Sequence, residues 1–366
     1  MELYVCDSNF NRLGMVGKFS YLLWRKRYSK HGEAELHVDA TTDNINLLRK
    51  GNILFRKDDN EAMFIYYRGF DEDDEGNDQL VVKCFSLVRW LDRRVLWGRY
   101  NYNDTPEKII RSMITSECIN PSDSKRKIAQ IQLAAAKGFG TVVQLQVSYA
   151  NLLDQGEALC NTYEIGIRSQ FDGRKLFYDL YKGVDRTVNQ SVNPRCILSK
   201  DFSNILKRNF EEADNDFKNT CLVAGAGEGM ARKFTSIEQG TGLDRRELFV
   251  DARDISDKKT VNNIEESIPD AEYNLLLRQR GLEKLLDYEE FISFDCEMDV
   301  TKENTKYGRD FFLGDIITIR DDKLGIIMNS RVVEADEVFK KTKETFVKVG
   351  KSVPTLTEKV RKMVKK

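Results

Sequence analysis

The chain has 366 residues, which is enough for two or three domains that each bury a core of their own. Its 58 basic and 59 acidic residues nearly cancel, and this balance argues against strong electrostatic binding of bare nucleic acid or of an anionic membrane. An apolar run of about 18 residues is absent, so we expect no membrane insertion. The strand-like opening at residues 1–6 shows no signal-peptide pattern.

Cysteine and histidine are too sparse and too scattered to predict a metal site. The seven cysteines stand singly, without a C-x-x-C pair, and the histidines are limited to His31 and His37. These two flank an expected strand, so we interpret them as surface residues. The cysteines are interpreted as buried thiols in a reducing compartment, and we expect neither metal nor cofactor.

The first hundred residues alternate polar and apolar side chains as β-strands do. Tyr21, Leu23, Arg25 and Arg27 fall on one face of the strand expected at 19–28. The other strands are expected at 3–5, 12–16, 33–38, 53–56, 62–69 and 79–85, and a short helix at 44–50 that is capped by Gly51.

Two sequence features of this region invite a functional interpretation. The acidic run 71–78 lacks the D-x-D-x-D-G spacing of an EF-hand loop, so we interpret it as a solvated hairpin tip. The aromatic and basic stretch 90–97 resembles a base-stacking platform. Because the overall charge is neutral, we instead predict burial of Trp90, Leu91, Val95 and Trp97, with both arginines outward.

The middle of the chain predicts three helices. Thr105 is a good N-cap before Pro106, and an apolar stripe follows at helical spacing, formed by Ile109, Ile110, Met113 and Ile114. The 3.6-residue period predicts further helices at 149–163 and 270–287. Strands are expected at 142–147, 164–169, 175–182, 195–199, 202–211, 216–224 and 247–251.

The C-terminal part predicts a last β-module and a final helix. Its strands are expected at 291–298, 311–320 and 324–334. A capping box at Thr355–Glu358 opens an amphipathic helix that runs to about Lys365. Its apolar stripe is Leu356, Val360, Met363 and Val364, which either covers the chain's own core or docks on a neighbour.

The glycine-rich segment 225–229 imitates a phosphate-binding loop without meeting its requirements. Gly225, Gly227 and Gly229 follow the apolar run Cys221–Val223 with the spacing G-x-G-x-G, whereas a dinucleotide fingerprint requires G-x-G-x-x-G before a helix. No Gly-Lys-Ser/Thr follows, and the next residues are polar and β-branched. We therefore predict a long hairpin over 214–254 with a glycine-rich tip.

The sequence offers no catalytic constellation that outweighs a surface interpretation. Neither histidine lies in a setting typical of a catalytic triad. The nearest candidates for a carboxylate pair are Glu289 with Glu290, and Asp251 with Asp254, which we interpret as solvated or ion-paired. The patterning therefore favours a structural or binding role, with no catalytic residues assigned.

Several segments together resemble the siphovirus-type tail hub family of phages and prophages of Gram-positive bacteria. They are Trp90–Gly98, Tyr181–Thr187, Asp216–Gly225 and Gly242–Asp251, supported by the opening Met1–Val5 and by Leu313–Thr318 to Arg331–Glu334. The likeness spans almost the whole chain. It implies a baseplate hub, similar to the hub part of tail-associated lysin proteins, that is made in the bacterial cytoplasm and located at the tail tip of a phage or an R-type bacteriocin.

The resemblance implies a mainly β fold with α (α+β), multidomain, in which two tube-like β-modules enclose inserted α/β domains. We expect a tube-like module at 1–104, a helical connection at 105–147, an α+β domain at 148–256, a second helical connection at 257–290, a second tube-like module at 291–345, and the C-terminal helix at 346–366. It also implies a homotrimer that adapts the six-fold tail tube to a central spike or fibre.

The partners expected from this resemblance are the tail tube or distal tail protein, the tape-measure protein, and the spike or fibre, without sequence-specific nucleic acid. Two alternatives stay open. A tail-borne cell-wall hydrolase would use Glu289 or Glu290. A glycan-binding tail module would use the aromatic cluster Trp90, Trp97, Tyr100 and Tyr102.

Overall fold

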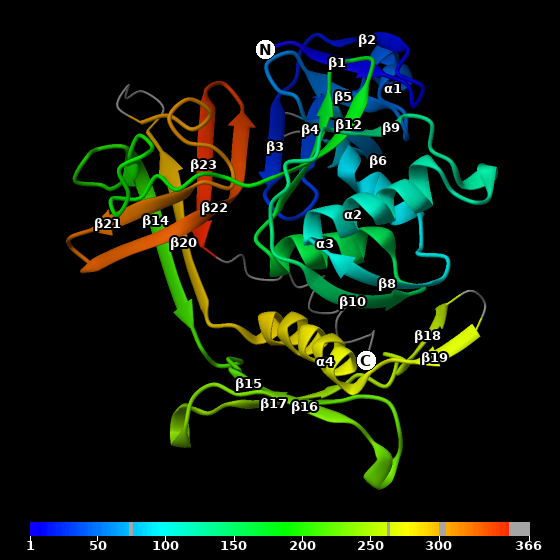
Figure 1. Ribbon diagram of the computed structural model, residues 1–366. Helices are drawn as coiled ribbons and strands as arrows, with labels where there is room; N and C mark the ends of the chain where they lie inside the picture. The colour runs from blue at the N-terminus through cyan, green and yellow to red at the C-terminus, as the bar shows by residue number, and fades with distance from the viewer. Residues whose placement is uncertain (73–75, 262–263, 300–304, 351–366) are drawn as a thin grey trace. The chain divides into compact units, whose positions relative to one another are not determined.

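The computed structural model describes residues 1–72, 76–261, 264–299 and 305–350 (Figure 1). The chain divides into two compact units, each made of segments that are not consecutive in the sequence. Unit 1 contains Met1–Val88, Gly166–Glu212 and the described part of Phe291–Lys366, and unit 2 contains Arg89–Ile165 and Ala213–Glu290. The domain boundaries expected from the sequence stay predictions, because a division by contacts does not test independent folding.

Unit 1 is built on one sheet of 13 strands. Eleven of them follow one another in the order β14 (Ile205–Ala213), β20 (Phe291–Met298), β23 (Lys343–Gly350), β22 (Ile326–Phe339), β3 (Tyr21–Arg27), β4 (Glu33–Asp39), β7 (Asp78–Ser86), β6 (Ala62–Glu72), β5 (Ile53–Arg56), β1 (Leu3–Cys6) and β2 (Arg12–Val16). The remaining two are β21 (Ile316–Asp321), which pairs with β22, and β13 (Ile197–Leu198), which pairs with β21.

Two hydrophobic cores lie along this sheet. The first is formed by residues between Leu3 and Cys84, and the second by residues between Cys196 and Val349. They meet where β3 of the N-terminal part pairs with β22 of the C-terminal part, so that Leu23 lies opposite Val338. The mainly β character expected from the sequence is confirmed, and two cores on one sheet are compatible with the two expected β-modules.

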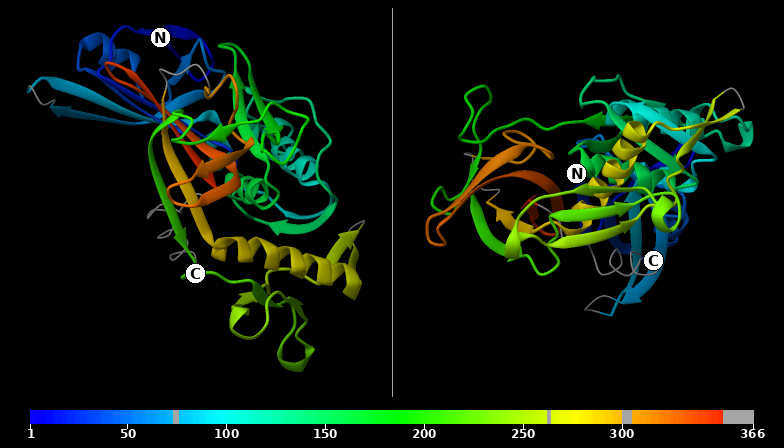
Figure 2. Two further views of the ribbon diagram at one scale, coloured as in Figure 1. Left: turned by 90° about the vertical axis from the view of Figure 1, so that its left-hand side faces the viewer. Right: turned by 60° about the horizontal axis from the view of Figure 1, so that its bottom comes forward.

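Smaller elements of unit 1 complete these cores. The helix α1 (Thr42–Leu47) is capped by Thr41 and followed by the buried Leu48, so it begins and ends earlier than predicted and Gly51 is not its cap. The strands β11 (Gly166–Phe171) and β12 (Leu176–Tyr181) form a hairpin. The hairpin of β6 and β7 carries the acidic tip and extends beyond its neighbouring strands in the left view of Figure 2.

A close backbone crossing in unit 1 requires glycine. A Cβ at Gly183 would lie 2.0 Å from the carbonyl carbon of Gly314, and Gly314 itself has φ +93° with the Tyr28 ring beside it. Side chains are therefore excluded where the segment after β12 crosses the start of β21.

Unit 2 combines helices with small sheets. Its helices are α2 (Pro106–Ile114), α3 (Leu152–Thr162) and α4 (Asp270–Leu285), and its strands are β8 (Arg99–Asp104), β9 (Ile131–Leu133), β10 (Val143–Ser148), β15 (Thr220–Ala224), β16 (Phe234–Ile237), β17 (Glu247–Asp251), β18 (Lys258–Val261) and β19 (Ile264–Ser267). Short turns of helix occur at Leu87–Arg93, Thr115–Ile119, Ser124–Arg126, Gly229–Ala231, Gly242–Asp244 and Leu286–Tyr288.

The helix α2 shows most directly how the sequence determines a local element. Thr105 accepts a hydrogen bond from the amide of Lys108, Pro106 occupies the first turn, and all four residues of the predicted apolar stripe are buried. The helices predicted at 149–163 and 270–287 are also present, but α3 begins at Leu152 because Asn151 caps it. Tyr149 lies outside that helix with φ +52° and is exposed.

Several expectations are wrong. Val95 and Trp97 are exposed rather than buried, because Arg126 lies over the Trp97 ring and donates a hydrogen bond to the carbonyl of Val95. The strands β8, β18, β19 and β23 were not predicted, since each is short or rich in charged residues. The helix expected at 355–365 lies outside the described residues. Within the described part, none of the helices combines the length and apolarity that crossing a membrane requires.

Candidate functional site on the charged face of the sheet

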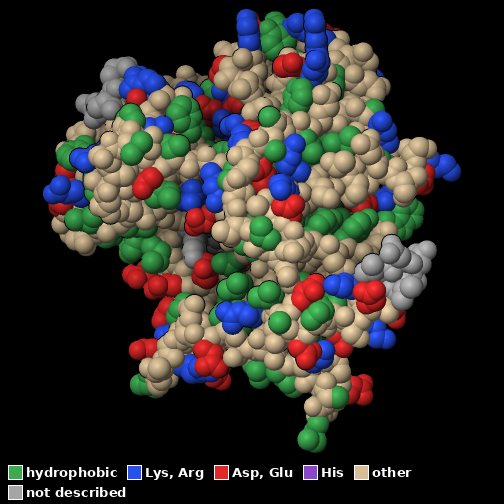
Figure 3. All heavy atoms as spheres, in the orientation of Figure 1, with side chains coloured by type: hydrophobic (Ala, Val, Ile, Leu, Met, Phe, Trp, Pro, Cys, Tyr) green, Lys and Arg blue, Asp and Glu red, His purple; other side chains and the backbone are tan. Residues whose placement is uncertain are grey.

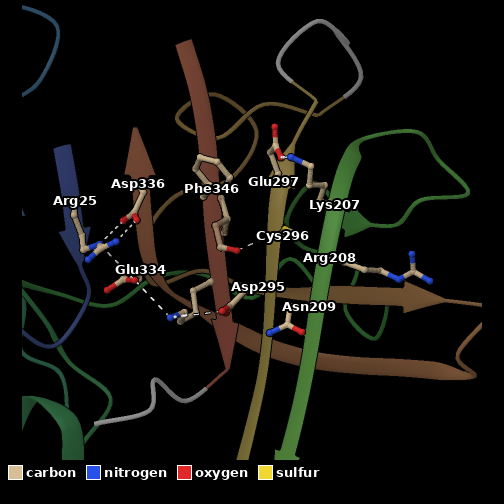
Figure 4. Close-up of a pocket in the computed structure, with 12 residues that line it drawn as sticks. Arg25, Lys207, Arg208, Asn209, Asp295, Cys296, Glu297, Glu334, Asp336 and Phe346 are labelled. Atoms are coloured by element: carbon tan, nitrogen blue, oxygen red, sulfur yellow. Dashed lines mark hydrogen bonds and ion pairs between the residues drawn. The ribbon is translucent and has the colours of Figure 1, made fainter. Parts of the chain in front are cut away.

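Five neighbouring strands of unit 1 present charged side chains on one face. Alternate residues of β14, β20, β23, β22 and β3 point to opposite faces. Phe294, Cys296, Ala335, Val347 and Val349 are buried on one side. The opposite side, of which Figure 4 shows a part, carries what we call the charged ladder: Arg25, Arg27, Lys207, Asp295, Glu297, Glu334, Asp336 and Lys348, together with Glu33 of the adjacent strand β4.

Strand register places opposite charges directly across from one another. In one row, Arg27 lies opposite Glu334, which lies opposite Lys348, which in turn lies opposite Asp295. In the next row, Arg25 lies opposite Asp336. Cross-strand pairs of opposite charge stabilise a sheet, and the signs here alternate across four strands.

The contacts of the charged ladder are close. Arg25 donates to Asp336 Oδ1 and to Glu33 Oε1, both at 2.7 Å, and Arg27 donates to Glu334 Oε2 at 2.7 Å. At the far strand, Lys207 Nζ lies 3.0 Å from Glu297 Oε2. The five acidic and four basic side chains of the ladder therefore nearly cancel, and each carboxylate lies beside a basic group.

Lys348 links two strands of the ladder. Its Nζ lies 3.6 Å from Asp295 and 3.7 Å from Glu334. Beyond the ladder, Glu35 of β4 contacts His37 of the same strand and Lys83 of β7. The ladder borders a shallow pocket of about 500 Å³.

The pKa shifts resolved in the ladder reflect a balance between burial and pairing, and burial raises the pKa of Asp336 although Arg25 opposes that shift. Burial works against the charge of Arg25, but its hydrogen bonds to Asp336 and Glu33 raise its pKa above the usual range. Burial likewise disfavours ionised Glu33, yet Arg27 and Arg25 lower the pKa of that carboxyl overall. The remaining candidate nucleophile beside the pocket is Cys296, and burial raises the pKa of its thiol, which therefore stays protonated.

A second set of charges, which we call the buried ionic cluster, combines Lys26, Glu337 and Lys343 on the reverse face of β3, β22 and β23 with Arg56 of β5 and with Asp58, Asp59 and Glu61 between β5 and β6. Arg56 donates to Glu337 Oε2 at 2.7 Å and to Asp58 Oδ2 at 2.8 Å. Lys26 Nζ lies 2.8 Å from Asp59 Oδ2. Burial, followed by repulsion from Asp59, raises the pKa of Glu61 to about 8.

The glycine-rich segment lies at the tip of a hairpin, but the prediction of one long hairpin over 214–254 is wrong, because only β15 and β16 form it and β17 pairs with β15 in parallel. β15 and β16 pair antiparallel, and the amide of Gly225 donates to the carbonyl of Lys233. The amide of Ala226 donates to the Tyr273 hydroxyl at 2.8 Å. Gly227 has φ +97°, as a tight turn requires. The loop amides thus serve the hairpin itself.

The structure holds Asp251 and Asp254 in separate ion pairs with arginines. Asp251 contacts Arg232 and Arg253, and hydrogen bonding to Arg253 lowers its pKa to about 2. Asp254 forms a two-pronged ion pair with Arg280. Within the described residues, no group of three or more His, Cys, Asp or Glu side chains is arranged to hold a metal ion.

The aromatic cluster considered for glycans offers little open surface, although Tyr100 and Tyr102 stack on each other. Trp90 is buried, and Tyr100 donates a hydrogen bond to the buried Glu117 at 2.6 Å. Of the four residues only Trp97 is broadly exposed. His37 lies within β4 with Gln79 and Glu35 on its two ring nitrogens, so it does not flank a turn.

The charged ladder was missed at the sequence level, although a signal exists. Three strands carry charges of one sign two residues apart: Arg25 with Arg27, Glu334 with Asp336, and Asp295 with Glu297. This spacing places both charges of a pair on the same face of a strand. Which strands become neighbours is not visible in that pattern.

Comparison with known proteins gives a family and a fold. A family model described as Siphovirus ReqiPepy6 Gp37-like protein matches residues 2–350. No curated protein matches the sequence. Among solved structures, the tail protein from Neisseria meningitidis MC58 is similar, with 10% identity, a TM-score of 0.56 and coverage of 96% of each chain.

Two further solved structures are similar to this chain over nearly its full length. The 43 kDa tail protein of prophage MuSo2 from Shewanella oneidensis has 9% identity and a TM-score of 0.57, over 95% of this chain and 98% of that one. The prophage tail protein gp18 from Listeria monocytogenes EGD-e has 12% identity and a TM-score of 0.55, over 100% and 99%. At these identities the likeness concerns the fold.

Proposed function

The chain belongs to the Siphovirus ReqiPepy6 Gp37-like protein family, and from this membership and its tail-protein fold we propose that it is a structural hub at the tip of a phage tail or of an R-type bacteriocin. In this role it adapts the six-fold tail tube to a central spike or fibre as a homotrimer. Its partners are the tail tube or distal tail protein, the tape-measure protein, and the spike or fibre.

The observation that carries the proposal is the charged ladder. It covers one face of a wide sheet, and each of its carboxylates lies beside a basic group. The wall of a passage for DNA or an extended protein must be hydrated but must not bind phosphate groups. Each unpaired basic side chain that neutralises a phosphate would increase the affinity of the wall for DNA. Basic and acidic side chains are also interspersed over the face shown in Figure 3. We assign the ladder to the wall of the central passage.

The two cores on one sheet support the symmetry-adapting role. Three copies of a chain with two β-modules supply six comparable modules around one axis. The rest of the chain is present in three copies, as a three-fold partner requires. The joint between modules is the β3–β22 pairing, which is reinforced on one face by the charged ladder and on the other by the buried ionic cluster. We propose a structural rather than a catalytic role for this chain.

Imaging of assembled particles tests the proposal. The full chain is mixed with its tail-tube and distal tail partners, its solution mass is measured, and the assemblies are imaged by electron microscopy. We expect three-fold rings in which the charged ladder lines the central opening. A chain that stays monomeric at high concentration with these partners present, or a ring whose ladder is buried between proteins, contradicts the proposal.

A zymogram on host peptidoglycan tests the structural role separately. We expect no clearing by the wild-type chain. Clearing that is lost in Glu289→Gln or Glu290→Gln would show a hydrolase instead.

A further inference from the structure

The buried ionic cluster holds a lysine and an aspartate in direct contact. Lys26, near the end of β3, places its Nζ 2.8 Å from Oδ2 of Asp59, which lies between β5 and β6. The two side chains are only 19% and 8% exposed. Such a contact has two chemical outcomes, because the groups either remain an ion pair or condense to an amide. The surroundings of the pair decide between them.

The two oxygens of the Asp59 carboxyl group have different partners. Oδ1 accepts a hydrogen bond from the backbone amide of Glu61 at 2.9 Å, whereas Oδ2 faces Lys26. Together these contacts orient the carboxyl group. When a nucleophile adds to the carboxyl carbon, the amide of Glu61 lies at the oxygen on which negative charge develops. Oδ2 is then the oxygen that can leave.

Glu61 supplies an acid next to this carboxyl group. It is buried, and burial, followed by repulsion from Asp59, raises the pKa of Glu61 to about 8. At neutral pH its carboxyl group therefore mostly carries a proton. A carboxylic acid in this state can donate a proton to a departing oxygen and accept one from an attacking amine.

Aromatic side chains enclose the pair. The Tyr307 ring lies 5.8 Å from Lys26 Nζ, and the buried Tyr181 is close enough to Glu61 and Tyr307 to interact with both. Burial works against the charge of Lys26, but Tyr307 and Asp59 raise the pKa of its ammonium above the usual range. The resting pair is therefore ionic. Transfer of one proton across the contact gives a neutral amine and a neutral acid, and burial favours neutral forms over charged ones.

We propose that Lys26 and Asp59 condense to an intramolecular amide within unit 1. The neutral amine adds to Cγ of Asp59, so that the Nζ–Cγ bond forms and Oδ1 takes the negative charge. Glu61 gives its proton to the Oδ2 hydroxyl, and the Cγ–Oδ2 bond breaks with its electron pair leaving on water. The Glu61 carboxylate then takes a proton from Nζ. The ammonium and the carboxylate thus become one amide and one water, without any further reactant.

The amide closes a loop between two positions that are 33 residues apart, and it ties β3 to the connection between β5 and β6. Such a link constrains the unfolded chain as a disulfide does, but a reductant does not open it. The seven cysteines of the chain are all free. Since β3 also pairs with β22, the link lies on the strand where the two cores meet. This inference does not depend on the proposed hub role.

Lys233 and Asp270 form a matched control pair in the same chain. Lys233 Nζ lies 2.9 Å from Asp270 Oδ1, which is nearly the same distance, but the Asp270 side chain is 83% exposed. Water stabilises the charged forms here, so we expect this pair to remain an ion pair. If proximity alone were sufficient, an amide would form at both places.

Mass spectrometry of the denatured full chain tests the proposal. We expect the wild type to be lighter than its sequence by one water molecule. A protease digest should contain a branched peptide that joins residues 26 and 59, and none that joins 233 and 270. A chain with the full mass of its sequence overturns the proposal. A loss of water that maps to Asp172–Gly173, where an aspartate before glycine can close to a cyclic imide, also overturns it.

Two variants separate the amide from the ion pair, and far-ultraviolet circular dichroism verifies that each is folded. Lys26→Arg keeps the charge but its guanidinium stays protonated and does not condense, so we expect the full mass of its sequence and slower migration than wild type in a denaturing gel. Asp59→Asn releases ammonia instead of water and gives the same amide, so its final mass should equal that of wild type. A mass loss that persists in Lys26→Arg, or unequal masses of Asp59→Asn and wild type, contradicts the proposal.

Discussion

The charged ladder and the buried ionic cluster use the same residue types on opposite faces of β3, β22 and β23, and the cluster also includes residues of β5 and of the segment that follows it. Along β3, Arg25 and Arg27 belong to the ladder, whereas Lys26 between them belongs to the cluster. Side chains of the ladder are partly open to solvent, while the Arg56 side chain in the cluster is 2% exposed. Position within the pleat therefore decides which set a charge on these strands joins, whereas exposure varies within each set, since Asp58 of the cluster is 58% exposed and Glu334 of the ladder is 13% exposed.

The comparison teaches that an ion pair has a different role on each face. In water, a pair contributes little to stability and serves mainly to cancel charge. In the interior, a pair is costly to break, because the remaining partner is left charged without solvent. We infer that the ladder shapes a surface and that the cluster holds two cores together. The four predictions below test that division.

The largest effect is expected for Arg56→Met. This change leaves the buried Glu337 without the guanidinium at 2.7 Å and is expected to lower the free energy of unfolding by about 3–5 kcal/mol. Urea denaturation measures it. The double variant Arg56→Met with Glu337→Gln is the matched control and should recover much of the loss. A single-variant loss below about 1 kcal/mol would contradict a structural role for the cluster.

Glu61→Gln is expected to change how stability depends on pH. The folded pKa of about 8 lies above the ordinary 4.5, so the stability that Glu61 contributes is complete below about pH 4.5 and is lost as pH rises toward 8. The groups around it are Asp59, Lys26, Arg168 and Ser86. The variant should match wild type near pH 4 and exceed it by roughly 3 kcal/mol near pH 7. Parallel pH curves for the two proteins would exclude this effect.

Arg25→Gln addresses the ladder at its best-connected point. Because Arg25 contacts Glu33, Glu334 and Asp336 but stays partly exposed, we expect a loss of about 1–2 kcal/mol in denaturant unfolding. Arg25→Lys keeps the charge without the two-pronged geometry and should recover only part of it. A loss of stability as large as that of Arg56→Met would contradict the inference that ion pairs of the ladder contribute less to stability than those of the buried ionic cluster.

Lys207→Ala is expected to have the smallest effect. The ammonium contacts Glu297 at 3.0 Å, but the lysine side chain is 82% exposed. Its denaturation midpoint should be indistinguishable from that of wild type, as is usual for exposed pairs. Any effect should appear in the assembled particle, as altered passage of DNA. A clear loss of stability would show that this end of the ladder is structural.

Local elements were predictable where neighbouring residues determine them. Thr105 with Pro106 determined the start of α2, and the alternation in 33–38 determined that Ala34, Leu36 and Val38 face a core. Long-range pairing was not predictable. β23 carries four charged residues in eight and is recognisable as a strand only because β20 and β22 flank it. Trp97 was expected inside, yet Arg126 covers its ring at the surface.

The same limit applies to the candidate sites. The sequence shows that Arg25 and Arg27 share a face, but not that Glu334 and Asp336, more than 300 positions later, lie opposite them. It shows Lys26 and Asp59 as ordinary charged residues, but not that their side chains lie in contact and largely away from solvent.

The sequence by itself determined the class of the fold, the start of α2 and the faces of individual strands, because capping and side-chain period depend on residues within one turn or one pleat. The tertiary structure alone decided which strands are neighbours, and with that which charges are paired, which are buried and which surface is open. Strand pairing joins residues far apart in the chain, so its outcome depends on the packing of the whole unit rather than on any local pattern.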